Sequence, residues 1–528
     1  MTATGPFSGA VGLALCVAAT CGCYRFAVSP AVRDLSHQLA AKRDLRPATW
    51  AVTAVAVAAP ALGTSPSPGS LRWCTLFVLA ALTWRFATTD YDQTQPLGPQ
   101  RRAGCLLLAC AAGVALWPPL LLCWLALACG RLRGWQHHPM LALRLLKAYL
   151  AWFFAAFLLN GALAESLLQD GLLLVLCCVA LSHYLKAAES KLRLGPHWWS
   201  WAWRNRTHCL IASAYSWGWA RFLSPPTAVR VLRAAAPLNR PLNIATMLLE
   251  LSPLVAFADR WALVAALAAT VLFNVVVVLA SGIFFWENIA ANAALAITVA
   301  AWPRALFGLS ALPLALPVLV AAVAGWVWQP WPLGWWDTPF TARVRWEVRT
   351  ASGRRLGLYN GFMCPYERDF GRVLGYFLTR EPVVHGHLGT VFDHHLRDRI
   401  LTADADPSTL SGIKRDDGHV HADATLARKH LDYLSATFTA LNSGASKGPL
   451  PRRLRWLKAP GGQLFRWGDL PSYRGEEPVT EISIHYEERY YRSAVGEFVT
   501  LTDRLLHRLD IPLSVPRPAR SADEKNPR

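Results

Sequence analysis

Charged residues are scarce in this sequence. Only 16% of its 528 residues are Asp, Glu, Lys or Arg, whereas 53% are apolar. A water-soluble protein carries about 25% charged residues, so a single water-soluble fold is excluded. The scarcity is greatest in residues 1–336, which hold 10 of the 34 acidic and 24 of the 53 basic residues. This part is predicted to be a membrane domain, and the rest is predicted to be a charged domain that faces water.

Several signatures of chemistry are also missing. The chain has no Gly-rich phosphate-binding loop and no Gly-x-Ser-x-Gly elbow, so it lacks the sequence marks of P-loop nucleotidases and α/β-hydrolases. Eleven of its twelve cysteines, from Cys16 to Cys209, lie in or beside apolar segments. Thiols behave there as small hydrophobic groups, so no disulfide framework is expected.

The positive charge of the chain does not indicate a nucleic acid partner. The formal net charge is +19, and +14 of it lies in the apolar part. Short basic loops between membrane spans follow the positive-inside rule, and they account for this charge. The expected partner is therefore the lipid bilayer, and no nucleic acid is expected.

Long apolar runs dominate the first domain. A helix that crosses a bilayer needs about 20 apolar residues, and several of the runs are shorter. The expected fold class is a polytopic α-helical protein of the cell membrane, with about nine to eleven spans and an extramembrane C-terminal α+β domain. The apolar runs cover residues 7–28, 48–62, 71–87, 103–129, 145–163, 171–185, 207–222, 243–258, 261–282, 283–302 and 306–327.

One of these runs, residues 103–129, contains Pro118 and Pro119 directly after Trp117. Proline removes a backbone donor and clashes with the preceding helical turn. The run is therefore either one long kinked helix or a hairpin that returns to the side from which it came. The sequence leaves both alternatives open.

Alternating residues indicate strands in the C-terminal domain, residues 337–511. Val344, Trp346 and Val348 alternate with charged residues, and a Ser-Gly pair then supplies a turn, which predicts a hairpin. A second alternation covers residues 482–487. Helical patterns at 367–378 and 426–441 complete an α+β domain. Residues 512–528 are polar and rich in proline, so they are predicted to form a disordered tail.

Among the charged residues in or beside the predicted spans, Glu250, Asp259, Arg260 and Glu287 are selected for their possible function. A charge inside a bilayer is costly and is by default a functional hypothesis, so Glu250 and Glu287 are candidate site residues. In the alternative interpretation the two acids lie near span ends, where they contact water or a loop arginine. Asp259 and Arg260 are predicted to form a short loop.

Residues 183–192 carry a second candidate group. On a helix, Tyr184, Ala187, Ala188 and Lys191 share one face, with a phenol at one end, an amine at the other and two small residues between them. Such a face could admit a flat ring against the backbone. A lysine at an apolar boundary loses its charge easily through desolvation, which makes Lys191 a candidate base. The alternative is a snorkelling lysine that anchors a span.

This segment resembles the one that carries the catalytic lysine in vitamin K-dependent γ-glutamyl carboxylases and in their bacterial relatives, the HTTM membrane proteins. The pattern of that family is a tyrosine, small residues, a Lys-Leu pair and then a tryptophan. Tyr184, Ala187, Lys191-Leu192 and Trp198 take these places, with a slightly longer gap before the tryptophan. The plan of a multi-span body followed by a strand-bearing domain is also similar.

Further along the chain, the family has a histidine followed by an aromatic-rich stretch that contains glycine. The counterpart here is residues 273–286, where Asn274 stands at the place that often holds the histidine. An amide cannot relay a proton as an imidazole can, so Lys191 is the one catalytic residue that the resemblance implies. Tyr184, Glu250, Asn274 and Glu287 are expected to line the cofactor site.

The resemblance implies quinol chemistry. In that family the lysine deprotonates a hydroquinone, the quinol reacts with oxygen, and the oxygenated quinone becomes a base that removes an unactivated proton. Carbon dioxide traps the carbanion in the vitamin K-dependent enzymes. The cofactor expected here is reduced menaquinone or a related hydroquinone, and the substrate is a lipid, a peptide or a small molecule. A lysine serves as such a base when burial lowers its pKa toward ambient pH.

Two other functions stay open at this point. Histidines gather between residues 385 and 395, but their spacing matches no metal motif with a mechanism, so no metal site is expected. The chain could instead be a transporter, or an immunity or partner-binding membrane protein, in which Glu250 and Glu287 line a polar path. Convergence of Tyr184, Lys191, Glu250 and Asn274 on one pocket would favour the enzyme.

Overall fold

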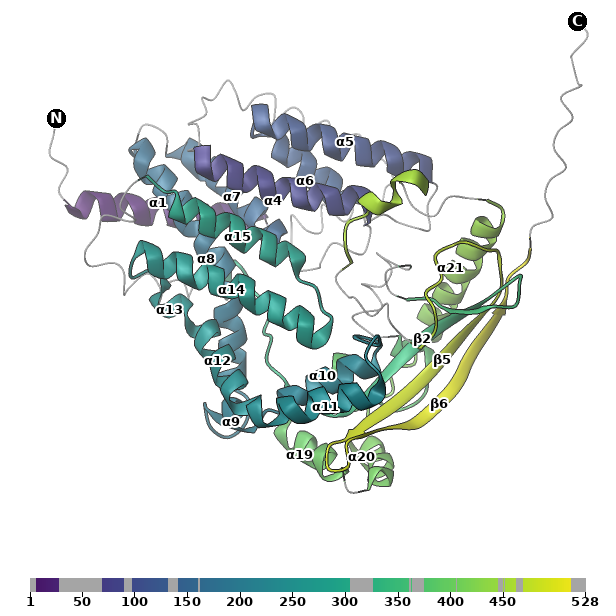
Figure 1. Cartoon of the computed structure of the whole chain (residues 1–528). Helices are drawn as coiled ribbons and strands as arrows, with labels where there is room; N and C mark the ends of the chain where they lie inside the picture. Colours follow the sequence, from purple (N-terminus) through teal and green to yellow (C-terminus); the bar gives the residue numbers. More distant parts are fainter. Residues whose placement is uncertain are drawn as a thin grey trace, which may run out of the picture.

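The protein is seen in a computed structural model, in which a helical body adjoins a region that contains a β-sheet (Figure 1). The predicted apolar runs 48–62 and 306–327 lie wholly or almost wholly outside the described residues, and so does most of the predicted tail, 512–528. The structure describes residues 6–27, 69–89, 97–131, 141–159, 162–303, 326–359, 362, 375–404, 406–444, 450, 452–461 and 469–513.

Helix α8 (Glu165–Leu192) is the centre of the helical body. It packs against α1 (Pro6–Ala27) and α7 (Leu141–Leu158), and its residues 171–182 are buried without a break. Three of the described helices, α7, α8 and α14 (Arg260–Ser281), are long and apolar enough to cross a membrane. This number is compatible with membrane association and is smaller than the nine to eleven spans predicted.

The two prolines at positions 118 and 119 form the turn of a helical hairpin. Helix α5 (Leu97–Leu116) ends just before them and α6 (Leu120–Arg131) begins just after them. The two helices pack against each other and lie side by side in Figure 1. The amide of Leu120 donates to the carbonyl of Trp117 at 3.1 Å, which closes the turn. Of the two alternatives for this run, the hairpin is therefore the correct one.

Two of the predicted spans are wrong as single helices. The run 207–222 contains a helix of only 10 residues, about 15 Å long, which is too short to cross a bilayer. The run 243–258 is divided at Pro253, because proline cannot donate the next helical hydrogen bond. The helices of this part are α9 (Ser200–Arg204), α10 (Thr207–Ser216), α11 (Pro225–Ala235), α12 (Asn239–Leu251), α13 (Pro253–Ala256) and α15 (Trp286–Ala300).

The loop predicted at Asp259 and Arg260 is the start of α14. The Asp259 carboxylate accepts hydrogen bonds from the amides of Trp261 and Ala262, at 2.6 and 3.2 Å, so it caps the helix as an acidic residue at this position does. The Arg260 Nε atom donates to the carbonyl of Val299 at 3.1 Å. This contact ties α14 to the end of its neighbour α15.

The C-terminal region is built on an antiparallel sheet with the strand order β3-β2-β5-β6. The predicted hairpin and the strand predicted at 482–487 are both confirmed. The helix predicted at 426–441 is also confirmed, as α21 (Ala424–Asn442). Of the other predicted helix, 367–378, residues 367–374 lie outside the described residues, and Tyr376–Leu378 form a short 3-10 helix. The strands are β2 (Phe340–Thr350), β3 (Arg355–Gly357), β5 (Val479–Arg492) and β6 (Glu497–Asp510), with a separate pair, β1 (Trp336–Asp337) and β4 (Thr390–Val391).

Helix α21 covers the apolar face of this sheet. Tyr433, Leu434 and Phe438 of the helix are buried in one cluster with the inward side chains of β2 and β5. The Trp346 indole of β2 donates to Nε2 of His430 on α21, with 2.9 Å between the two nitrogens. The helices α19 (His394–Thr402) and α20 (Leu410–Asp417) lie near the end of the sheet that adjoins α10 and α11 (Figure 1).

We expect His430 to make the stability of this region depend on pH. Burial lowers the pKa of His430 from 6.5 to about 3. Between these two pH values His430 is protonated in the unfolded state and neutral in the folded state, so the free energy of unfolding decreases as the pH falls. The loss is about 1.4 kcal/mol of unfolding free energy per pH unit below 6.5. His430→Gln, which keeps an acceptor for the Trp346 indole, should reduce this dependence. Denaturant unfolding of both proteins at pH 7 and at mildly acidic pH measures it, and equal slopes would contradict the prediction.

Candidate functional site

Two of the predicted site residues, Lys191 and Glu250, form a buried ion pair. The Lys191 Nζ atom lies 2.6 and 2.8 Å from the two carboxylate oxygens of Glu250, and the two residues are 7% and 2% exposed. The indole ring of Trp201 stands 5.2 Å from the same nitrogen. The amine is therefore held between a carboxylate and an aromatic face.

Helix α12 presents Glu250 to the last turn of α8. Its buried residues are Asn243, Met247 and Glu250, which recur at i, i+4 and i+7 and so share one helical face. The Asn243 side chain donates to the carbonyls of Asn205 and Ala202, at 2.9 and 3.2 Å. These bonds fix the rotation of α12 two turns before the carboxylate.

Tyr184 forms the second layer of the site. Its hydroxyl oxygen accepts hydrogen bonds from the side-chain amides of Asn274 on α14 and Asn292 on α15, at 2.6 and 2.8 Å. The ring of Phe273 meets the Tyr184 ring edge to face, with 6.3 Å between the centroids. The side-chain carbonyl oxygen (Oδ1) of Asn292 is buried and accepts no hydrogen bond from the described residues. An unsatisfied buried acceptor is costly, so this atom is a candidate partner for a ligand hydroxyl.

The two layers are close along α8. Seven residues separate Tyr184 from Lys191, which is about 10 Å along the helix. Of the predicted set, the structure thus brings together Tyr184 with Asn274, and Lys191 with Glu250, in two adjoining polar layers. Asn292 of α15 also belongs to the first of these layers.

The face between the layers is covered by protein side chains. Ala188 is fully buried in one cluster with Trp201, Met247 and Trp336. Gly334 lies against the α8 backbone, where a Cβ atom would stand 2.9 Å from the amide nitrogen of Lys191, so only glycine allows this close approach. The flat ring predicted to lie on this face is supplied, in this conformation, by tryptophan.

The residues that connect this site to β1 were not predicted from the sequence. The Asn205 side chain donates to the Asp337 carboxylate at 2.7 Å and accepts from the Asp337 amide at 2.9 Å. Burial raises the pKa of Asp337 to about 6, although the side chains of Asn205 and Trp335 donate to it. The Trp201 indole donates to the carbonyl of Trp335 at 2.7 Å. Helix α9 and its C-cap therefore join the lysine to β1.

Glu287 pairs with a residue outside the two layers. Its carboxylate pairs with the guanidinium of Arg85 on α4 (Gly69–Thr88), and both side chains are buried. The pair lies beside the edge-to-face contact of Trp84 and Trp286, whose centroids are 5.4 Å apart. The structure therefore places Glu287 at the junction of α4 and α15, where it serves helix packing.

The histidines of the C-terminal region are separate from the site as well. Among the residues that the structure describes, no group of three or more His, Cys, Asp or Glu could hold a metal ion. Burial lowers the pKa values of His385 and His387 to about 4, so both are neutral near pH 7. His385 packs edge to face on the ring of Phe340, with 4.9 Å between the centroids, as a core side chain does.

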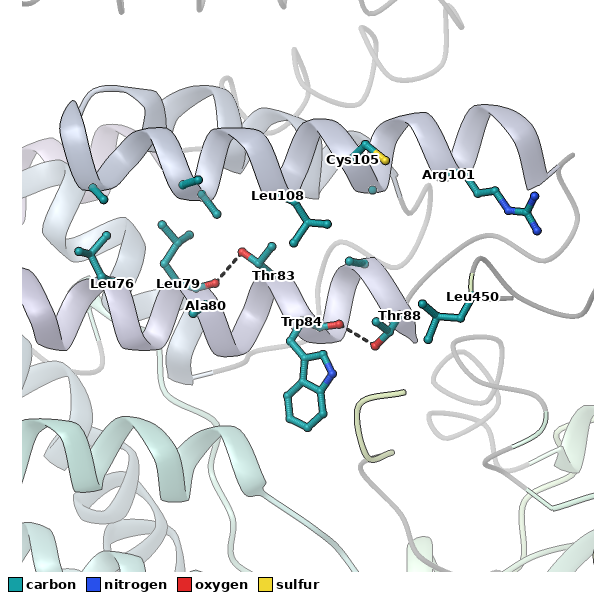
Figure 2. Close-up of a pocket in the computed structure, with 15 residues that line it drawn as sticks. Leu76, Leu79, Ala80, Thr83, Trp84, Thr88, Arg101, Cys105, Leu108 and Leu450 are labelled. Atoms are coloured by element: carbon teal, nitrogen blue, oxygen red, sulfur yellow. Dashed lines mark hydrogen bonds between the residues drawn. The ribbon is translucent and has the colours of Figure 1, made fainter. Parts of the chain in front are cut away.

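An apolar groove of about 750 Å³ lies between α4 and α5 (Figure 2). The hydroxyls of Thr83 and Thr88 in its wall donate to the carbonyls of their own helix, at 2.6 and 2.7 Å, and Arg101 lies at one end. The rest of its wall is mainly leucine and alanine, with Trp84, Gly104 and Cys105, and it includes none of the predicted site residues. The groove has the chemistry to hold a hydrocarbon chain, away from Lys191.

We expect the Lys191–Glu250 pair to be strongly coupled. Glu250→Leu should lower the unfolding free energy by about 3–5 kcal/mol, because it leaves a buried ammonium without its partner. The double variant Lys191→Met with Glu250→Leu should recover most of that loss, since two apolar side chains need no partner.

The matched control is Glu189→Leu, which removes the partly exposed pair that Glu189 forms with Lys186 at 2.8 Å. That change should cost about 0–1 kcal/mol. Tryptophan fluorescence during denaturant unfolding of the purified proteins measures all of these variants. If Glu250→Leu were as stable as the double variant, the two charges would not be coupled.

No family among known proteins is assigned by similarity. No family model matches the chain, and neither the curated proteins nor the solved structures contain a match. The site is therefore characterised by its own residues: a buried lysine and glutamate above a tyrosine held by two asparagines.

Proposed function

We propose that the protein is a multi-pass enzyme of the cell membrane that uses Lys191 as a base toward a hydroquinone such as reduced menaquinone. The observation that carries the proposal is the burial of the Lys191–Glu250 pair next to the Tyr184 layer. The substrate, from which the reaction removes a proton, is a lipid, a peptide or a small molecule. The resemblance of residues 184–198 to the carboxylase-like HTTM proteins supports the same conclusion.

Glu250 gives Lys191 a way to become a base. The Nζ atom and the Oε1 atom are 2.6 Å apart, so the ammonium proton can pass to the carboxylate along one hydrogen bond. Transfer of that proton leaves a neutral amine beside a neutral acid, and neither needs a counter-charge. The amine can then accept a proton from a bound hydroxyl, and Glu250 retains the first proton until solvent removes it.

The Tyr184 layer has the polar atoms that a hydroquinone would need. The orphan carbonyl oxygen of Asn292 can accept a hydrogen bond from a quinol hydroxyl, and the Tyr184 hydroxyl is fixed beside it by two amides. Phe273 adds an aromatic wall to this layer. A hydroquinone bound here would supply the electrons that reduce oxygen, while the chain itself holds and moves the proton.

The transport alternative draws less support from the same residues. A polar path needs accessible carboxylates, whereas Glu250 is 2% exposed and directs both oxygens to Lys191. Glu287 is paired with Arg85 in another part of the body. These two acids therefore do not lie along one path in this conformation.

The test is quinol oxidation in liposomes. The purified protein is reconstituted with reduced menaquinone in air, and the quinone and its epoxide are followed by mass spectrometry. We expect the wild type to form epoxide and Lys191→Ala to form none above background, because the amine that takes the proton is removed. Lys186→Ala is the matched control, since this lysine lies on the same helix and pairs with Glu189 at 2.8 Å.

Either of two outcomes would contradict the proposal. The first is wild-type turnover that Lys191→Ala leaves unchanged, which would place the chemistry elsewhere. The second is absence of turnover with reduced menaquinone, ubiquinol and phylloquinol alike, in protein whose unfolding curve is intact.

A further inference from the structure

Helix α12 has its polar and apolar sides reversed relative to a helix on a water-facing surface. Its buried side carries Asn243 and Glu250, whereas a water-facing helix buries apolar residues and exposes polar ones. The outward residues are Leu242, Ile244 and Leu248, which are 39%, 37% and 65% exposed. An aliphatic outward side above a polar inward side suits an apolar medium outside the helix.

The inward polar groups of α12 are fully used. Asn243 donates to two backbone carbonyls and accepts from the Thr207 hydroxyl at 2.5 Å, and Glu250 binds Lys191 through both oxygens. The helix therefore cannot rotate to bury its leucines without breaking these contacts. Its outward apolar side is a fixed feature of the fold.

The apolar surface continues onto neighbouring helices. Helix α12 packs against α13 and α14, and the three lie together on one side of the body (Figure 1). In α14, a candidate membrane span, only 28% of the most apolar 18 residues are buried. The exposed residues that continue the surface are Leu254, Val255, Leu272, Val275, Val276 and Leu279.

Arginine and tryptophan pairs mark both ends of this surface. The Arg240 guanidinium lies 5.5 Å from the centroid of the Trp203 ring, and the Arg260 guanidinium lies 5.6 Å from that of Trp261. Both tryptophans are exposed, by 50% and 66%. These residue types gather where hydrocarbon meets headgroups. Helices α12 and α13, with the break at Pro253, lie between the two arginines.

We propose that the outward side of α12 and α13 lies against the acyl chains of the bilayer, with lipid phosphates at the two Arg–Trp pairs. The break at Pro253 divides this segment into two short helices, but its reversed polarity marks its outward side as lipid-facing. The Lys191–Glu250 pair then lies at membrane depth, separated from lipid by a single helix. This inference concerns the surface and does not depend on the quinol chemistry.

The test is photocrosslinking of the full chain in vesicles of phosphatidylethanolamine and phosphatidylglycerol. Benzoylphenylalanine replaces Leu248 in one variant and Val255 in a second. The matched control replaces Leu505 on β6, an aliphatic residue with a comparable exposure of 43% that lies in the C-terminal sheet. After irradiation, mass spectrometry measures phospholipid bound covalently to the protein.

We expect about tenfold more lipid adduct at positions 248 and 255 than at position 505, because an acyl chain then lies within reach of the first two residues. Lipid yields at 248 and 255 no higher than at 505 would overturn the proposal. Crosslinks from 248 to a second copy of the chain, in place of lipid, would also overturn it and would identify the surface as a subunit interface. Val255 keeps the test valid if the Leu248 variant does not fold.

Discussion

The arrangement of the helical body depends on the cost of burying Lys191. An ammonium removed from water loses several kcal/mol of solvation, which only a close counter-charge with good geometry can offset. Glu250 supplies that charge through both oxygens, and it can do so only if α12 turns its polar side inward. The ion pair therefore dictates the rotation of α12, and the rotation in turn dictates that its leucines face outward.

Asparagine side chains hold the surrounding elements in place. Asn274 and Asn292 bring α14 and α15 to the hydroxyl of Tyr184, and Asn205 joins α9 to β1 through Asp337. An amide has both a donor and an acceptor, so it can satisfy buried partners without adding a charge that would itself need one. The same network links the lysine to the sheet, so the site and the C-terminal region are mechanically connected.

A proton on Lys191 has a short route within this frame, because the Nζ and Oε1 atoms already share a hydrogen bond. Trp201 and Trp336 pack with Ala188 of α8 in one buried cluster. Trp201 belongs to α9 and Trp336 to β1, so a ligand ring that took their place against α8 would have to displace both indoles. Access to the site is therefore tied to the position of the C-terminal region.

Local patterns of the sequence determined the division into an apolar body and a charged region, the strand around Val344, and the helix at 426–441, because period and composition are local properties. They also singled out Lys191, Tyr184 and Glu250 as unusual in an apolar setting. Only the tertiary structure decided that Lys191 meets Glu250, 59 positions away, that Glu287 belongs with Arg85 instead, and that the run 243–258 divides at a proline. Pairing between distant residues depends on how helices rotate and pack, and no periodicity along the chain encodes that rotation.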